Sequence, residues 1–245
     1  MCQITLMPTA LHRHSDAWSY GCPVSHTVHS CALCVHPSSL RSARLNQSSQ
    51  FYQPVVDLAR DVALLLRCPT WTGGGPGMMR AASEGAMQAG LPVGAVKISR
   101  EAGQQSVRTA DYLPQGTSVV CKHMPTRKAA LTDAGVRREE QQRTAYVFLP
   151  GGLGTMDELF AILTLIQLNK LDTQYPVPLV VVNYEGFFDG LLQMLSALNS
   201  SGVMKQSEVD GLYVAKCNSD VLCHLGSFYD LDNSSIVASG NGHPQ

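Results

Sequence analysis

The chain has 245 residues, of which 44% are hydrophobic and 15% charged, and its formal net charge at pH 7 is −1. This length suits one α/β domain, or at most two small ones, with enough apolar residues for a sizeable core. The near-zero charge argues against a bulk attraction for nucleic acid or anionic membranes, and no apolar run approaches the roughly 18 residues that a membrane span needs. The low charged fraction predicts that part of the surface is buried in an oligomer.

The first 50 residues differ in composition from the rest, with a single acid (Asp16), three arginines, five histidines and many serines. We expect residues 1–29 to form a disordered leader, with an organelle transit peptide as the alternative. The protein is then expected in the cytoplasm, or in an organelle if this leader acts as a transit peptide. The tail at 232–245 is rich in Asn, Ser and Gly and also reads as disordered, which leaves 30–231 for the folded domain.

Eight cysteines are scattered along the chain, and they are too few to form a disulfide scaffold in a chain this long. We therefore predict reduced thiols in an intracellular protein. The closest pair, Cys31-x-x-Cys34, lies among His26, His29 and His36. A zinc site would need a second pair at a familiar spacing, and none follows, so we predict no metal.

Helical and strand patterns alternate over most of the chain. In chain order, the patterns predict a helix at 52–66, strands at 92–98 and 118–121, a helix at 125–131, a strand at 144–149, a helix at 157–169, a strand at 179–182, a helix at 187–198 and a strand at 212–215. A short strand at 68–72 and a helix beginning at Pro76 flank a glycine-rich turn. This alternation predicts a doubly wound α/β fold whose ligand lies beyond the carboxyl ends of the strands.

Two glycine-rich turns fall at such strand ends, Gly73-Gly74-Gly75-Pro76-Gly77 and Gly151-Gly152-Leu153-Gly154. Glycine lets a backbone approach a ligand closely, and the helix that follows each turn offers free N–H groups to a phosphate. Neither turn has the P-loop pattern, and the G-x-G-x-x-G register fails at its last glycine, which disfavours a dinucleotide site. Two separate turns suit a monophosphate and its sugar; the alternative is that they are only tight strand-to-helix connections.

Charged residues stand beside both turns. Thr155 and Glu158 fit a capping box, which alone would explain the glutamate, and Asp157 fits the first turn of a helix. Arg127 and Lys128 follow another strand end, where the arginine could hold an oxyanion in a forked contact or simply be solvated. No serine-hydrolase pattern is present.

These residues resemble the LONELY GUY (LOG) family of cytokinin riboside 5'-monophosphate phosphoribohydrolases. The segment PGGLGTMDE at 150–158 matches the family pattern PGGxGTxxE in full, TGGGPGMM at 72–79 is similar to its first glycine turn, and HMPTRK at 123–128 to its segment ending in Arg-Lys. The resemblance covers about residues 30–230, and the helix after the second turn looks like the longer, higher-oligomer branch. Relatives were often labelled lysine decarboxylases, but nothing in this sequence suggests a pyridoxal phosphate site.

The resemblance implies a Rossmann-like fold, a homodimer or a hexamer of dimers with shared active sites, and no metal or organic cofactor. It implies hydrolysis of the N-glycosidic bond of a cytokinin riboside 5'-monophosphate, or of AMP, to a free base and ribose 5-phosphate, which activates the cytokinin. Arg127 and Glu158 match the catalytic pair. The positions that match substrate contacts are Gly73, Gly74, Gly75, Lys128, Gly151, Gly152, Gly154, Thr155 and Thr164.

The chain departs from the family pattern mainly in its N-terminal half, with His36-Pro37 in place of a glycine turn, Pro69 before the first glycine turn, Arg80 and Pro125. Two alternatives stay open: a non-catalytic nucleotide or molybdenum-cofactor carrier on the same fold, and an interaction module. We also predict that Glu158→Gln removes hydrolysis and leaves folding nearly intact, because Gln can still complete a capping box.

Overall fold

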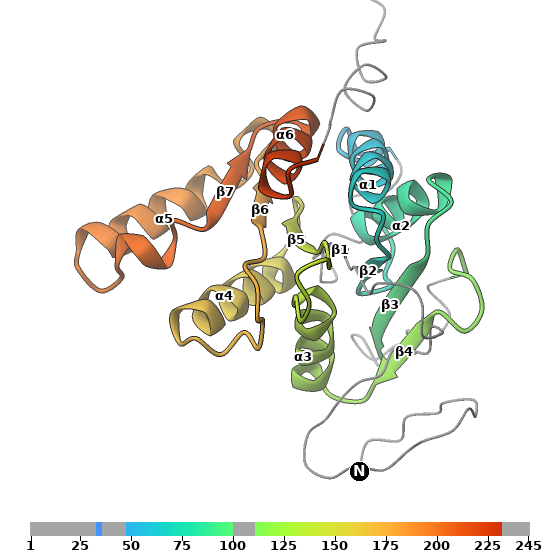
Figure 1. Cartoon of the computed structure of the whole chain (residues 1–245), viewed down its shortest axis with the longest axis horizontal. Helices are drawn as coiled ribbons and strands as arrows, with labels where there is room; N and C mark the ends of the chain where they lie inside the picture. The colour runs from blue at the N-terminus through green and yellow to red at the C-terminus, as the bar shows by residue number, and fades with distance from the viewer. Residues whose placement is uncertain (1–32, 36–47, 100–110, 232–245) are drawn as a thin grey trace, which may run out of the picture.

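The computed structural model describes residues 33–35, 48–99 and 111–231. Figure 1 shows the course of the chain, with strands and helices alternating. The strands are β1 (Leu33–Val35), β2 (Thr70–Thr72), β3 (Val93–Ile98), β4 (Ser118–Cys121), β5 (Ala145–Phe148), β6 (Leu179–Val182) and β7 (Leu212–Ala215). The helices are α1 (Tyr52–Leu66), α2 (Met78–Gln88), α3 (Met124–Gly135), α4 (Leu153–Gln167), α5 (Asp189–Ser200) and α6 (Asn218–Phe228), with short 3-10 turns η3 (Tyr184–Gly186) and η4 (Gln206–Glu208).

All seven strands form one parallel sheet in the order β4-β3-β2-β1-β5-β6-β7. The chain therefore builds outward from β1 in one direction through β4, and returns beside β1 to build in the other direction from β5. In such sheets, ligands bind beyond the carboxyl ends of the strands at the point where the order reverses. The predicted doubly wound α/β fold is confirmed, and its switch point lies between β1 and β5.

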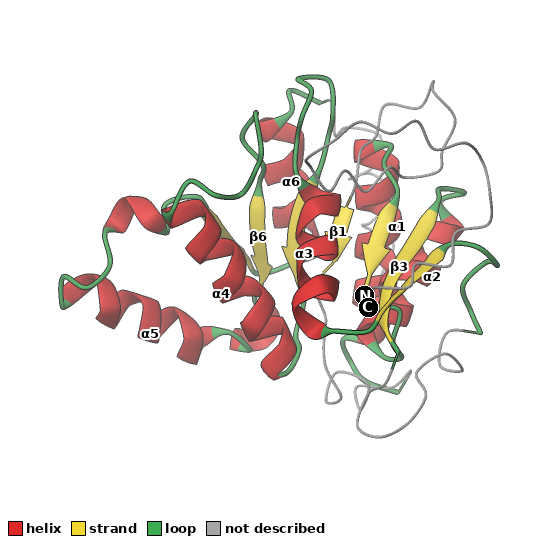
Figure 2. Ribbon diagram, turned by 90° about the horizontal axis from the view of Figure 1, so that it is seen from below, coloured by secondary structure: helices red, strands yellow, loops and turns green. Residues whose placement is uncertain are grey.

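Helices cover both faces of the sheet, with α3 and α4 on one face and α1, α2 and α6 on the other (Figure 2). Strand β5 shows how the sequence fits this arrangement. Ala145 and Val147 pack with α1 and α6, whereas Tyr146 and Phe148 pack with α4. All four side chains are buried, as expected for a central parallel strand that has helices on both sides.

The predicted helix at 157–169 is wrong at its start, because α4 begins at Leu153. Gly152 is its N-cap residue, in an extended conformation, so the chain passes from turn to helix with no intervening loop. Thr155 and Glu158 consequently lie inside the helix rather than at its cap. Because the helix begins four residues earlier than predicted, Thr155 is not its N-cap residue.

Some predicted helix starts also differ from the structure, and one helix is additional to the prediction. Helix α2 begins at Met78, two residues after Pro76, and the helix predicted at 187–198 begins at Asp189. Helix α6 was not predicted. The signal for its start was Asp220, whose carboxylate accepts hydrogen bonds from the N–H groups of Lys216 and Cys217. Pro69 precedes β2, so the sheet loses no hydrogen bond to it: Thr70 N–H donates to the Pro92 carbonyl at 3.0 Å.

The leader at 1–29, the tail at 232–245 and the Cys31/His cluster lie outside the described residues. Within the described ranges, Cys68 and Cys121 are buried, and Cys217 and Cys223 carry exposed free thiols. Those ranges also contain no group of three or more His, Cys, Asp or Glu side chains that could hold a metal ion. No described helix is long and apolar enough to cross a bilayer.

Candidate functional site

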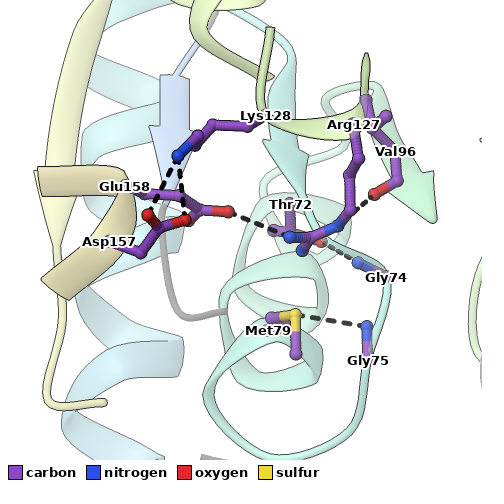
Figure 3. A network of polar contacts seen from close by, with 9 residues as sticks. All are labelled: Thr72, Gly74, Gly75, Met79, Val96, Arg127, Lys128, Asp157 and Glu158. Atoms are coloured by element: carbon purple, nitrogen blue, oxygen red, sulfur yellow. Dashed lines mark hydrogen bonds and ion pairs between the residues drawn. The ribbon is translucent and has the colours of Figure 1, made fainter. Parts of the chain in front are cut away.

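A buried ion pair joins α3 to α4 at the carboxyl edge of the sheet. Arg127 Nη1 donates to Glu158 Oε1 at 3.0 Å, with only 6% and 3% of the two side chains exposed. Arg127 lies in the first turn of α3, after β4, and Glu158 lies in the second turn of α4, after β5. Two residues 31 positions apart, which sequence reasoning could link only through the family resemblance, are thus brought into direct contact (Figure 3).

The guanidinium of Arg127 is fixed from two further sides. Its Nε donates to the Val96 carbonyl of β3 at 3.1 Å. It also packs on Gly73, where a Cβ would lie 1.9 Å from Arg127 Nη2. Any side chain at position 73 would therefore displace the arginine, and the first glycine turn is part of the structure that positions the ion pair.

The other two glycines of the first turn also accommodate the protein's own side chains. Gly74 N–H donates to Thr72 Oγ1 at 3.1 Å, and its φ of +71° favours glycine. Gly75 N–H donates to Met79 Sδ at 3.3 Å, and Met79 Cε fills the space that a Cβ would need. The spaces left by these glycines are therefore already filled, and their contact with substrate stays a prediction.

The second turn presents unpartnered polar groups. The Thr155 side chain is fully buried, and its Oγ1 has no hydrogen-bond partner in the part of the chain that the structure describes. It occupies the space beside Gly151, where a Cβ would lie 2.1 Å from Oγ1. The N–H groups of Gly151 and Gly152 likewise donate to none of the described residues, and no side chain caps α4. The start of α4 therefore has donors without acceptors among the described residues, with Gly151 and Thr155 buried and Gly152 half-buried.

The predicted capping box is wrong. A capping box needs Thr155 at the N-cap in a non-helical conformation, but Thr155 is the third residue of α4 and its N–H donates to Gly152 O at 3.0 Å. Freed from that role, Glu158 points toward Arg127. Asp157, expected in the first helical turn, lies in the second turn and pairs with Lys128.

Lys128 and Asp157 form a second cation–carboxylate pair between α3 and α4. Lys128 Nζ lies 2.9 and 3.1 Å from the two carboxylate oxygens of Asp157, with 32% and 54% of the side chains exposed. An exposed pair of this kind stabilises a fold by only about 0–1 kcal/mol. Of the other predicted positions, Gly154 lies in the first turn of α4, whereas Thr164 lies on its exposed side, away from the ion pair of the same chain.

Lys97 is a residue that sequence reasoning missed. It is 9% exposed, and its stem lies against Gly74, where a Cβ would meet Lys97 Cγ at 2.9 Å and Cε at 3.0 Å. Burial lowers the pKa of its ammonium group, and the nearby Asp111 carboxylate opposes that shift. The available signal was a single charged residue in the otherwise apolar strand VGAVKI.

Sequence comparison adds relatives of known name. A family model described as "Possible lysine decarboxylase" matches residues 79–225. Proteins named cytokinin riboside 5'-monophosphate phosphoribohydrolase from Mycobacterium tuberculosis and Mycobacterium marinum are 29% and 31% identical, over 71% and 62% of this chain and 87% and 73% of their own lengths. An Arabidopsis thaliana protein of the same name, LOG5, is 23% identical over 85% of this chain and 81% of its length.

Structure comparison gives more distant neighbours. The molybdenum cofactor binding protein from Rippkaea orientalis superposes with a TM-score of 0.51 at 16% identity, covering 82% of this chain and 99% of that one. The X-ray structure of a structural genomics target gives a TM-score of 0.53 at 15% identity with the same coverage. At these identities, the likeness establishes a shared fold and nothing finer.

Proposed function

The chain belongs to the LONELY GUY (LOG) family, and we propose that it hydrolyses the N-glycosidic bond of a nucleoside 5'-monophosphate, releasing a free base and ribose 5-phosphate. A cytokinin riboside 5'-monophosphate, with an N6-modified adenine, is the substrate that its named relatives suggest, and AMP is the second. The observation that carries the proposal is the buried Arg127–Glu158 ion pair, which lies between two glycine turns at the carboxyl edge of the sheet.

The proposed chemistry uses the carboxylate of Glu158. Breaking the bond between C1' and the base builds positive charge on the ribose, as in glycoside hydrolysis. A carboxylate beside that carbon stabilises the charge and accepts a proton from the attacking water. The water oxygen bonds to C1', and the electrons of the broken bond pass to the nitrogen of the base, which is then protonated. Arg127 orients Glu158, because its other donor Nε is anchored on Val96.

The start of α4 suits the 5'-phosphate. The N–H groups of Gly151 and Gly152 and the hydroxyl of Thr155 bond to none of the described residues and offer donors to an anion, which the positive end of the helix dipole also attracts. Glu158 follows Thr155 by one helical turn, so a nucleotide bound by its phosphate would place its ribose toward the carboxylate. The same donors explain why no side chain caps this helix.

A non-catalytic carrier remains the alternative, and a test can separate the two. Both wild type and variants are incubated with isopentenyladenosine 5'-monophosphate and with AMP, and free base is measured. Glu158→Gln should lose at least about 100-fold in rate, whereas Asp157→Asn, one residue away on the same helix, should retain near-normal rates. If wild-type protein binds the nucleotides and releases no base, the hydrolase proposal fails.

We further propose a homodimer that forms through α4. The helix is apolar on most of its surface, yet Leu153 is 83% exposed and Leu168 59% exposed. Exposed large apolar side chains on one helix mark an interaction surface. A second copy on α4 would also cover Thr164, which the single chain leaves exposed, and this agrees with its predicted contact with substrate in a shared site.

Size-exclusion chromatography with light scattering tests the dimer. Leu153→Glu should convert the dimer to monomer, because a charge would be buried in the interface. Val120→Glu is the matched control: Val120 is 39% exposed on β4, at the other end of the sheet, and its replacement should leave the dimer intact. A wild-type monomer would overturn the proposal.

A further inference from the structure

We infer that the first glycine turn and the start of α2 form a second anion subsite, with Lys97 as its cation, that takes a phosphate group distinct from the one held at the start of α4. The phosphate comes either from free inorganic phosphate or from a second phosphate group on a nucleotide. The inference rests on the proposed function, to which it adds a second phosphate group as ligand. Its test measures binding and not hydrolysis.

The first observation is the burial of Lys97. Its side chain is about nine-tenths buried, and it makes no hydrogen bond or ion pair within the described part of the chain. Asp111 is the acid that acts on it electrostatically, from an exposed position beyond the range of an ion pair. A buried ammonium group without a partner is costly, because desolvation disfavours the charged form. A bound anion would offset this cost.

The start of α2 is the second observation. No side chain caps this 11-residue helix, whose N-cap is Gly77, and its first helical hydrogen bond runs from Ala81 N–H to Gly77 O at 3.0 Å. The N–H groups of Gly77, Met78 and Met79 donate to no described residue, although all three residues are buried. The N–H groups at a buried helix start ordinarily have acceptors, so these three N–H groups are available to an anion.

The glycine turn brings the two together. Lys97 lies against Gly74, three residues before the N-cap of α2, on the face of the sheet that α2 covers. Met79 packs under Gly75 from the same helix turn (Figure 3). Tyr112 closes the far side, because its hydroxyl donates to the Gly75 carbonyl at 2.7 Å. The stem of Lys97 and the start of α2 therefore lie on the same side of the first glycine turn.

The subsite is separate from the ion pair, although both border the same turn. Arg127 lies over Gly73 on the α3 side of the sheet, whereas Lys97 lies against Gly74 on the α2 side. Arg127 is already committed to Val96 and Glu158. A phosphate at α2 would thus be held by groups that the proposed hydrolysis does not use.

Isothermal titration calorimetry on the full chain with inorganic phosphate tests the subsite. Wild type should bind two phosphates per chain, and Lys97→Met should bind one, with at least about a tenfold loss of affinity at the other. Lys170→Met, which removes an exposed lysine just after α4, should behave as wild type. If Lys97→Met binds phosphate with the wild-type number of sites and affinity, the inference is overturned.

Nucleotides identify the source of the phosphate. If a nucleotide supplies the second group, Lys97→Met should weaken adenosine 3',5'-bisphosphate or ADP at least about tenfold while AMP is little changed. If free phosphate is the ligand, these nucleotides should bind both proteins alike, and phosphate should bind alongside AMP only in wild type. Lys97→Gln, which keeps a polar head, replaces the methionine variant should that protein fail to fold. These experiments measure binding and not turnover, so their outcome tests the subsite even if the protein does not hydrolyse nucleotides.

Discussion

The two glycine turns look alike in sequence but differ in what their glycines do. In the first turn, the spaces at Gly73, Gly74 and Gly75 are filled by the side chains of Arg127, Lys97 and Met79. In the second turn, neither the hydroxyl beside Gly151 nor the neighbouring N–H groups bond to any residue that the structure describes. The glycines of the first turn make room for protein side chains, whereas the second turn leaves polar groups without partners among the described residues.

This difference shows that a glycine-rich turn is not evidence of ligand contact by itself. A missing Cβ leaves room either for a ligand or for another part of the chain, and only the structure tells which. Where the first turn offers free donors, they lie further on, at the start of α2. Substitutions at the two turns should therefore fail in different ways.

The largest effect is expected at Gly73. Gly73→Ala would place a Cβ 1.9 Å from Arg127 Nη2 and push the guanidinium off Glu158. A shift of about 1 Å in a catalytic group can cost about 100-fold in rate, so we expect at least that loss of kcat. Steady-state kinetics measure it, and Gly190→Ala, which has open space around its Cβ, is the control. Near-normal kcat in Gly73→Ala would show that the arginine is not held by this turn.

A smaller effect is expected at Thr155, in the second turn. Thr155→Val keeps the shape and removes the orphaned hydroxyl, so substrate affinity should fall roughly tenfold or more, as for a lost hydrogen bond to a charged group. Melting should be unchanged or higher, because no native hydrogen bond is lost. Thr155→Ser should restore most of the affinity. Equal nucleotide affinity in the valine variant would contradict a ligand at this hydroxyl.

The ion pair between the turns gives a stability prediction. Glu158→Gln leaves the buried guanidinium of Arg127 without its counter-charge, so we expect a loss of about 3–5 kcal/mol, or about 6–20 °C in melting temperature. The earlier expectation of near-intact folding depended on the capping box, which is absent. Calorimetry measures the shift, with Asp157→Asn as the exposed control, expected to change by about 0–1 kcal/mol. Equal shifts in the two variants would argue against a buried pair.

The smallest effect concerns the pH dependence of Lys97. Its folded-state pKa is lowered by burial from the ordinary 10.5, so the unfolded chain binds more protons and the penalty on folding is greatest below the folded pKa. Lys97→Met should therefore melt at or above the wild-type temperature at pH 7, and this difference should narrow as pH rises toward 10. Melting curves of both proteins in phosphate-free buffer measure it. A difference that grows with pH would contradict a destabilising buried charge.

The sequence predicted the sheet and most helices because strong hydrophobic patterns dominate there. The runs at 179–182 and 212–215 match β6 and β7 residue for residue. The sequence pattern predicted the wrong roles for Thr155 and Glu158, because the same spacing occurs in a capping box and in a helix interior. The conformation of Gly152, the N-cap residue, distinguishes the two. The contact between Arg127 and Glu158 depends on the order of the strands, which local pattern does not encode. Lys97 was missed for the same reason.

We propose that water attacks C1' of a nucleoside 5'-monophosphate in a site formed by Glu158 and Arg127. Incubating the protein with AMP and with isopentenyladenosine 5'-monophosphate in oxygen-18 water, followed by mass spectrometry, tests it most directly. We expect unlabelled free base together with ribose 5-phosphate that carries more heavy oxygen at C1' than ribose 5-phosphate kept in the same water without protein, from wild type and not from Glu158→Gln. Intact nucleotide recovered from a folded, nucleotide-binding wild-type protein would contradict it.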